Sequence, residues 1–179
     1  MKKGAVKWLL VFMLTTLAVA LGGCAGDKEG ESSSQITIGI PQDLEDSLDP
    51  HKAVAAGTKE VLFNLFEGLV KPTSDGDLIP AVASAYEESE GGKVYTFTLR
   101  DGVKFHDGSL VTAEDVKFSL DKCADTSNGG PLVPAFSNIE SVTIADDHTV
   151  VVTLQEADTE FLAYMTTAII PKANENPDT

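Results

Sequence analysis

Residues 94–120 read VYTFTLRDGVKFHDGSLVTAEDVKFSL, and this stretch decides which fold the chain can adopt. Apolar and polar side chains alternate over 94–99, which is typical of a strand with one buried face. Asp101-Gly102 and Asp107-Gly108 then predict two turns, because glycine supplies the backbone freedom that turns need. Thr112, followed three residues later by Asp115, resembles a capping box that opens a helix running to about Lys122. Strand, turns and helix in one stretch indicate a mixed fold.

The flanking sequence predicts further elements of both kinds. Thr58 is the expected N-cap of a helix, Gly68 its expected stop, and Asp158 the expected cap of a later helix. By periodicity and turn residues we expect strands at 35–40, 139–144, 149–154 and 168–170, helices at 58–66, 81–85 and 158–165, and a hairpin turn at 73–77. The fold class predicted from this pattern is α/β in the broad sense, mixed α+β.

The first 35 residues predict export. Lys2, Lys3 and Lys7 precede an apolar run of about fourteen residues, shorter than the roughly 20 that span a bilayer. Leu21-Gly22-Gly23-Cys24 then resembles a lipobox, so residues 1–23 are interpreted as a signal peptide and Cys24 as the lipid-attachment site. An uncleaved transmembrane anchor is the alternative. Residues 24–35 are expected to form a flexible tether that links the membrane anchor to the exported part.

Charge and cysteine content limit the partners. The chain carries 13 Lys and Arg against 28 Asp and Glu, and removing residues 1–23 would lower the basic count to 10. This acidity argues against nucleic-acid binding and against adhesion to anionic lipids, and it favours solubility outside the cell. Beyond Cys24 only Cys123 remains, which is expected to be a buried apolar side chain of a helix.

Five motifs, in order, resemble the family 5 extracellular solute-binding proteins. They lie at 48–51 (LDPH), 66–70 (FEGLV), 78–83 (LIPAVA), 95–108 and 110–120, and the resemblance covers nearly all of residues 36–172. It implies a periplasmic-binding-protein type II-like fold, with two lobes that close on a solute and deliver it to the permease subunits of an ABC importer. The solutes of this family include peptides, nickel chelates, haem and oligosaccharides. The resemblance implies neither catalysis nor a cofactor.

The same resemblance suggests a division of the chain. By analogy, residues 36–57 begin lobe I, residues 58–164 form its side domain, and residues 165–179 return to lobe I. The second lobe would lie outside this sequence, so residues 25–179 are expected to bind little solute alone. Family members hold the amino terminus of a peptide with an acidic residue in that second lobe, which corresponds to no residue here.

His51 is the strongest candidate for solute contact, together with Asp49. Both lie in the loop after the first expected strand, and such loops often face the cleft in the family that the motifs resemble. His106 and Asp107 are expected to be turn residues. His51, His106 and His148 show no metal-ligand spacing, and no sequence motif for catalysis is present.

The function predicted from sequence is a substrate-binding lipoprotein of an ABC importer for oligopeptides or dipeptides, exported and lipid-anchored outside the cell membrane or in the periplasm. Three alternatives remain open: a receptor or sensor lipoprotein of the same fold, a truncated fragment without function, and a secreted hydrolase. No sequence motif supports the hydrolase.

Overall fold

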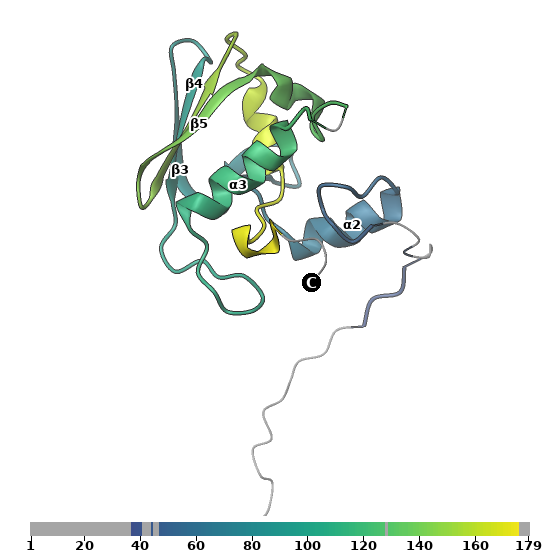
Figure 1. Cartoon of the computed structure of the whole chain (residues 1–179). Coiled ribbons are helices and arrows are strands. Elements are labelled where there is room, and N and C mark those ends of the chain that lie inside the picture. Colours follow the sequence, from purple (N-terminus) through teal and green to yellow (C-terminus); the bar gives the residue numbers. More distant parts are fainter. Residues whose placement is uncertain (1–36, 41–43, 45–46, 128, 176–179) are drawn as a thin grey trace, which may run out of the picture. The chain divides into compact units, whose positions relative to one another are not determined.

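The computed structural model describes residues 37–40, 44, 47–127 and 129–175. Two units divide the chain, one up to Gly39 and one from Ile40 onward. The helices and strands of the described residues all lie in the second unit (Figure 1). The predicted signal peptide, Cys24 and the tether fall outside the described residues.

A four-stranded antiparallel sheet forms the centre of the second unit. Its order is β3-β4-β6-β5, with bounds β3 Ala83–Ser89, β4 Val94–Leu99, β6 Thr149–Leu154 and β5 Ile139–Asp146. Strands β4 and β6 bury alternate side chains, as their sequence pattern predicts: Tyr95, Phe97, Leu99, Val150, Val152 and Leu154. These side chains make one face of the sheet apolar.

Helix α3, Ala113–Ala124, covers that apolar face (Figure 1). The predicted capping box is confirmed, because the Thr112 N–H donates to Asp115 Oδ2 at 2.9 Å and the Asp115 N–H donates to Thr112 Oγ1 at 3.3 Å. Cys123 is fully buried, and burial raises the pKa of its thiol to about 12. The expectation of a buried cysteine in a helix is therefore confirmed, and a raised pKa disfavours the reactive thiolate.

Aromatic rings from two 3-10 helices complete the core. Phe161 lies in the 3-10 helix η2, Phe161–Thr166, with its ring centre 5.9 Å from that of Tyr95 and 5.8 Å from that of Phe136. Phe136 belongs to the 3-10 helix η1, Pro134–Asn138. Residues 158–165 were expected to form an α-helix, and the shorter η2 replaces it. The Asp158 carboxylate caps the preceding turn by accepting the Glu160 N–H at 2.9 Å.

A small hairpin and a helix precede the sheet. The hairpin joins β1, Val70–Pro72, to β2, Leu78–Pro80, and confirms the predicted turn at 73–77. Helix α2 spans Ala56–Leu65, so Thr58 is not its N-cap but a fully buried residue of its first turns. The helix ends with Phe66 as its C-cap, two residues before Gly68.

Three predictions from local pattern were wrong. Residues 81–85 are not helical, because Ala81 and Val82 donate backbone hydrogen bonds to Leu69 and Gly68 and β3 begins at Ala83. Residues 168–170 form no strand and are held by single hydrogen bonds to other segments. Residues 37–40 of the first expected strand are also irregular. In the first two cases hydrogen bonds to distant segments override local propensity. The described chain ends in a 3-10 helix, η3, Lys172–Glu175.

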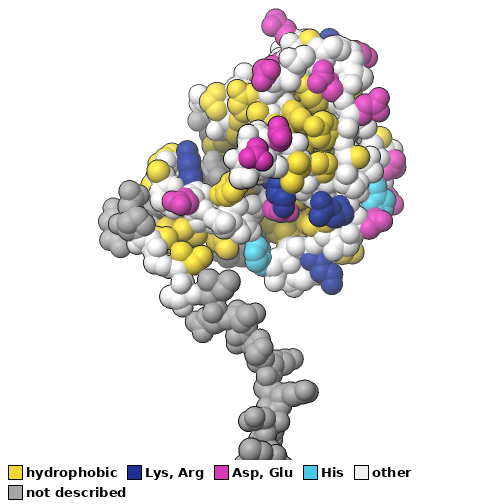
Figure 2. Space-filling view, turned by 180° about the vertical axis from the view of Figure 1, so that it is seen from behind, with side chains coloured by type: hydrophobic (Ala, Val, Ile, Leu, Met, Phe, Trp, Pro, Cys, Tyr) yellow, Lys and Arg dark blue, Asp and Glu magenta, His cyan; other side chains and the backbone are white. Residues whose placement is uncertain are grey.

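The surface carries an excess of acidic side chains. Figure 2 shows acidic side chains over most of this view, with most of the basic ones in its middle and lower part. Yellow apolar side chains are also exposed on this face. Within the described residues, no helix combines the length and the hydrophobicity required to cross a bilayer.

Two distant segments, 66–69 and 165–169, pass each other at contact distance; we call this the crossing. A Cβ atom on Gly68 would lie 2.5 Å from both the Met165 carbonyl oxygen and the Thr166 carbonyl carbon. The Ile169 N–H donates to the Glu67 carbonyl oxygen at 2.9 Å across it. Only glycine at position 68 permits this separation, since both obstacles are backbone atoms.

We therefore expect Gly68→Ala to destabilise the fold by on the order of 2 kcal/mol, the usual cost of forcing an extra group into a packed site. Chemical denaturation measures this change in the free energy of unfolding. Gly39→Ala is the matched control, because a Cβ there meets nothing within 4 Å. Equal stability of the two variants would show that the crossing relaxes freely.

Candidate functional site

Two hollows lie on either side of Phe66. The first, which we call the His51 hollow, has a volume of about 290 Å³ and is formed by the 50–53 loop, α2 and the segments 132–133 and 166–168. The second, the His106 hollow, has a volume of about 330 Å³ and is formed by residues 65–67, the 103–111 loop and the 169–171 segment. The Phe66 side chain lines both, so the end of α2 organises both sites.

A turn built by Asp49 fixes His51. The Asp49 carboxylate accepts the His51 N–H at 2.9 Å, and the Asp49 carbonyl oxygen accepts the N–H groups of Lys52 and Ala53, each at 3.0 Å. Asp and Pro at 49–50 favour such a turn. The turn holds the imidazole so that its Nε2 lies 2.8 Å from the Ala168 carbonyl oxygen. Because a carbonyl only accepts, Nε2 carries the proton and Nδ1 is left as a buried acceptor without a partner among the described residues.

Burial favours the neutral form of His51. Burial is the main cause that lowers the pKa of His51, and the nearby Lys122 lowers it further, against the Ala168 hydrogen bond and the Asp49 charge. Burial would raise the pKa of Asp49, but the His51 N–H and the Lys122 ammonium, 3.1 Å away, together lower it. Asp49 is therefore ionised and His51 neutral near pH 7.

The structure brings Asp49 and His51 together but gives them different surroundings. His51 lines its hollow, whereas the Asp49 carboxylate is occupied by the His51 backbone, Lys122 and, at 3.8 Å, Lys52. Asp49 thus positions the loop in which His51 lies. A direct contact of either residue with solute stays a prediction.

Sequence reasoning missed most of the walls of the His51 hollow. Phe63 and Leu132 stand at its rim with 62% and 44% of their surface exposed, and Lys59 also lines it. Leu65, the last residue of α2, is also exposed. The sequence did contain one signal for these walls. The apolar residues around α2 are more numerous than one face of a surface helix can bury, so some of them must be exposed.

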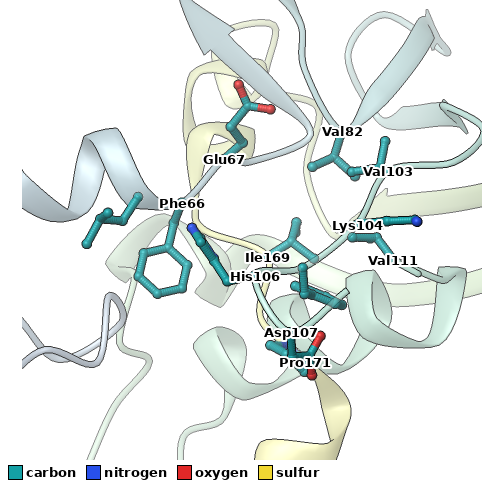
Figure 3. A pocket seen from close by; sticks show the side chains of 12 residues that line it. Phe66, Glu67, Val82, Val103, Lys104, His106, Asp107, Val111, Ile169 and Pro171 are labelled. Carbon is teal, nitrogen blue, oxygen red and sulfur yellow. The ribbon is translucent and has the colours of Figure 1, made fainter. Parts of the chain in front are cut away.

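Loop 103–111 forms one wall of the His106 hollow. Val103 and Val111 join the two ends of this loop by a backbone hydrogen bond of 2.9 Å, and Gly108 turns it with a φ of 89°. Figure 3 shows Phe66 and His106 side by side, with Glu67 and Lys104 pointing away from them in different directions. The two rings meet edge to face with centres 6.3 Å apart. His106 is therefore a turn residue in aromatic contact, in keeping with its expected structural role.

The chemistry of both hollows is that of binding surfaces. Apolar side chains and polar groups line both of them, with the larger polar share in the His51 hollow, as in pockets that hold small molecules by contact. Among the described residues, no three His, Cys, Asp or Glu side chains cluster as metal ligands would. The Asp107 carboxylate is engaged by Ser109 and serves the turn.

Comparison with known proteins gives one consistent result. Residues 77–179 match the family model described as bacterial extracellular solute-binding proteins, family 5 Middle. The chain is 37% identical over 126 residues to the oligopeptide-binding protein OppA of Bacillus subtilis, covering 69% of this chain and 23% of that relative.

Solved structures agree with the fold. The murein tripeptide binding protein MppA of Escherichia coli matches with a TM-score of 0.66 and 31% identity, over 74% of this chain and 30% of that one. NikZ of Campylobacter jejuni, in complex with Ni(L-His), matches with a TM-score of 0.60 and 33% identity, over 63% and 23% of the two chains. The chain spans about a quarter to a third of the length of several of the curated relatives.

The state of His51 predicts a pH dependence of stability. Because its folded-state pKa lies below the ordinary value of 6.5, the unfolded chain takes up the proton first as the pH falls. The contribution of neutral His51 to the free energy of unfolding is complete above pH 6.5. It is lost as the pH falls from 6.5 to the lower folded-state pKa of His51. The Asp49 carboxyl group changes the stability only at a lower pH, below its ordinary pKa of 3.8.

We expect the melting temperature to fall between pH 7.5 and pH 5.5, and to fall less in His51→Gln, whose amide retains a donor for the Ala168 carbonyl. Thermal melts of both proteins at the two pH values measure this difference. Identical pH dependence in the two proteins would show that His51 is not held neutral by the fold.

Proposed function

This chain belongs to the bacterial extracellular solute-binding proteins of family 5, a non-enzymatic family, and from that premise we propose that it captures peptides outside the membrane for an ABC importer. It would form part of lobe I, with residues 36–57 beginning the lobe, 58–164 forming its side domain and 165–179 returning to it. A second lobe outside this sequence would close over the solute, which is then delivered to the permease subunits.

The observation that carries the proposal is the His51 hollow. It is open, it is rimmed by exposed apolar side chains, and it lies at a loop whose LDPH sequence resembles a motif of the family. A hollow of about 290 Å³ is at the small end for a complete ligand pocket, as expected for one of two facing walls. We therefore place the solute over the 50–53 loop, with His51 and the positioning residue Asp49 beneath it.

A peptide is favoured over other solutes of the family. OppA of Bacillus subtilis is named for binding oligopeptides, and MppA of Escherichia coli for binding a murein tripeptide. The walls of the His51 hollow combine apolar side chains with at least as much polar surface, which suits a peptide, whose side chains lie beside backbone amides. The Ni(L-His) bound by NikZ makes a metal chelate the second candidate.

We further propose that Cys24 carries a lipid and holds the protein at the outer face of the cell membrane or in the periplasm. The Lys-rich start, the short apolar run and the Leu-Gly-Gly-Cys sequence support this. An importer needs its binding component near the permease, and acylation achieves that while the tether at 24–35 lets the folded part move.

Capture from a peptide mixture tests the proposal. The complete gene product containing this chain, without its signal, is incubated with a synthetic oligopeptide pool, washed and analysed by mass spectrometry. We expect retained peptides with dissociation constants that calorimetry can measure, and little retention by residues 25–179 alone. The absence of any retained peptide from the complete protein would contradict a peptide-binding role.

Phe63→Ala tests the place of the site. Loss of an exposed aromatic wall should weaken peptide binding about tenfold while leaving stability unchanged, because Phe63 is mostly solvent-exposed in the free protein. Ile79→Ala is the matched control, since Ile79 is 41% exposed on β2 and lines neither hollow. Equal affinities of the two variants would move the solute away from the His51 hollow.

A further inference from the structure

The His51 hollow is a local exception in a strongly acidic chain. The sequence contains 28 Asp and Glu against 13 Lys and Arg, yet no acidic side chain lines this hollow. The charged side chain that does line it is Lys59, beside the neutral His51. A solute group that enters the hollow therefore meets a positive charge and no carboxylate.

Lys59 also has no acid three or four residues away along its helix. The positions three and four residues away on α2 and its N-cap are Ala55, Ala56, Leu62 and Phe63. The ion pairs found among the described residues engage Lys52, Lys71, Lys117 and Lys122, but not Lys59.

The other nearby cations share one carboxylate. Lys122 lies 3.1 Å from the Asp49 carboxylate, and Lys52 lies 3.8 Å from the same group. One carboxylate cannot balance two ammonium groups, so this cluster keeps a net positive charge. Of these lysines, Lys59 is the one that lines the hollow.

Apolar contacts surround this charge. Phe63 stands one turn along α2 from Lys59, and Leu132 approaches from the segment before η1. Both are exposed in the free protein, so covering them with an apolar group releases water at little structural cost. The floor is formed by buried Leu62 and Ala53.

We propose that the His51 hollow takes the apolar, carboxylate-bearing end of the solute, the C-terminal residue of a short peptide, with Lys59 pairing with the carboxylate and Phe63 and Leu132 flanking the side chain. This inference rests on the proposed peptide-binding function and adds the orientation of the peptide. The argument is charge complementarity between an acid-free wall and an anionic end group.

The size of the effect depends on coverage by the solute. An exposed ion pair contributes little, because water screens it. Once the peptide covers Lys59, the pair becomes a charge-assisted hydrogen bond in a drier environment. We therefore expect a free carboxylate to improve affinity about tenfold over a neutral amide at the same end.

The test uses the complete gene product and an equimolar mixture of two apolar tripeptide pools, identical except that one ends in a free carboxylate and the other in a carboxamide. Mass spectrometry measures the ratio of acid to amide among the retained peptides. The wild-type protein should retain the acids about tenfold in excess. Lys59→Gln should bring that ratio close to one, while still retaining peptides through the apolar walls.

Lys104→Gln is the matched control. Lys104 is also exposed and outside the ion pairs found in the described residues, but it lines the His106 hollow, so its loss should leave the ratio unchanged. Acids and amides retained equally by the wild-type protein would overturn the inference while leaving peptide binding intact. An unchanged acid preference in Lys59→Gln would overturn it too. If neither pool is retained, peptide binding itself fails and the inference fails with it.

Discussion

The close passage of residues 66–69 past residues 165–169 is the constraint on which the rest of the structure depends. Gly68 lets the two backbones approach to a separation that any side chain would prevent. The Glu67 carbonyl then accepts the Ile169 N–H, and the His51 imidazole donates to the Ala168 carbonyl one residue earlier. Three segments far apart in the sequence are joined there. The next residue, Ile170, adds a further hydrogen bond, because its N–H donates to Ser119 Oγ of α3.

This junction also places the walls of both hollows. Phe66, the C-cap of α2, lies two residues before Gly68, so the direction of its ring follows from the crossing. On one side the ring meets the 103–111 loop through His106, and on the other it faces the 166–168 segment. A change at the junction would therefore alter both surfaces together. The four-stranded sheet and α3 serve as the rigid support against which Phe161 and Met165, on the returning segment, are packed.

Sequence could predict the elements whose signal is local. The alternation in β4 and β6, the Thr112 and Asp115 capping box and the glycine turns at 102 and 108 depend on residues close together in the chain, and all appear in the structure. The predictions for residues 81–85 and 168–170 were wrong for the opposite reason. Their conformation is set by hydrogen bonds to Leu69, Glu67 and Ser119, which lie between about 12 and 100 residues away and leave no periodic trace.

The candidate site shows the same division. The LDPH motif pointed to Asp49 and His51, and the Asp–Pro turn chemistry explains their close approach. The sequence could not reveal that Lys122 balances Asp49, or that Ala168 holds the imidazole, because these contacts cross 73 and 117 positions. Lys59 became visible as an isolated charge only when the structure showed which side chains surround it.

Amide hydrogen exchange at Ile169 and Ile170, followed by nuclear magnetic resonance, tests most directly whether the crossing holds this part of the molecule together. These two residues lie in irregular backbone, so only their hydrogen bonds to Glu67 and Ser119 can protect them. We expect both amides to exchange as slowly as those of the central strands β4 and β6. Exchange as fast as that of the exposed 75–77 turn would contradict the claim that the crossing holds the fold and its two hollows.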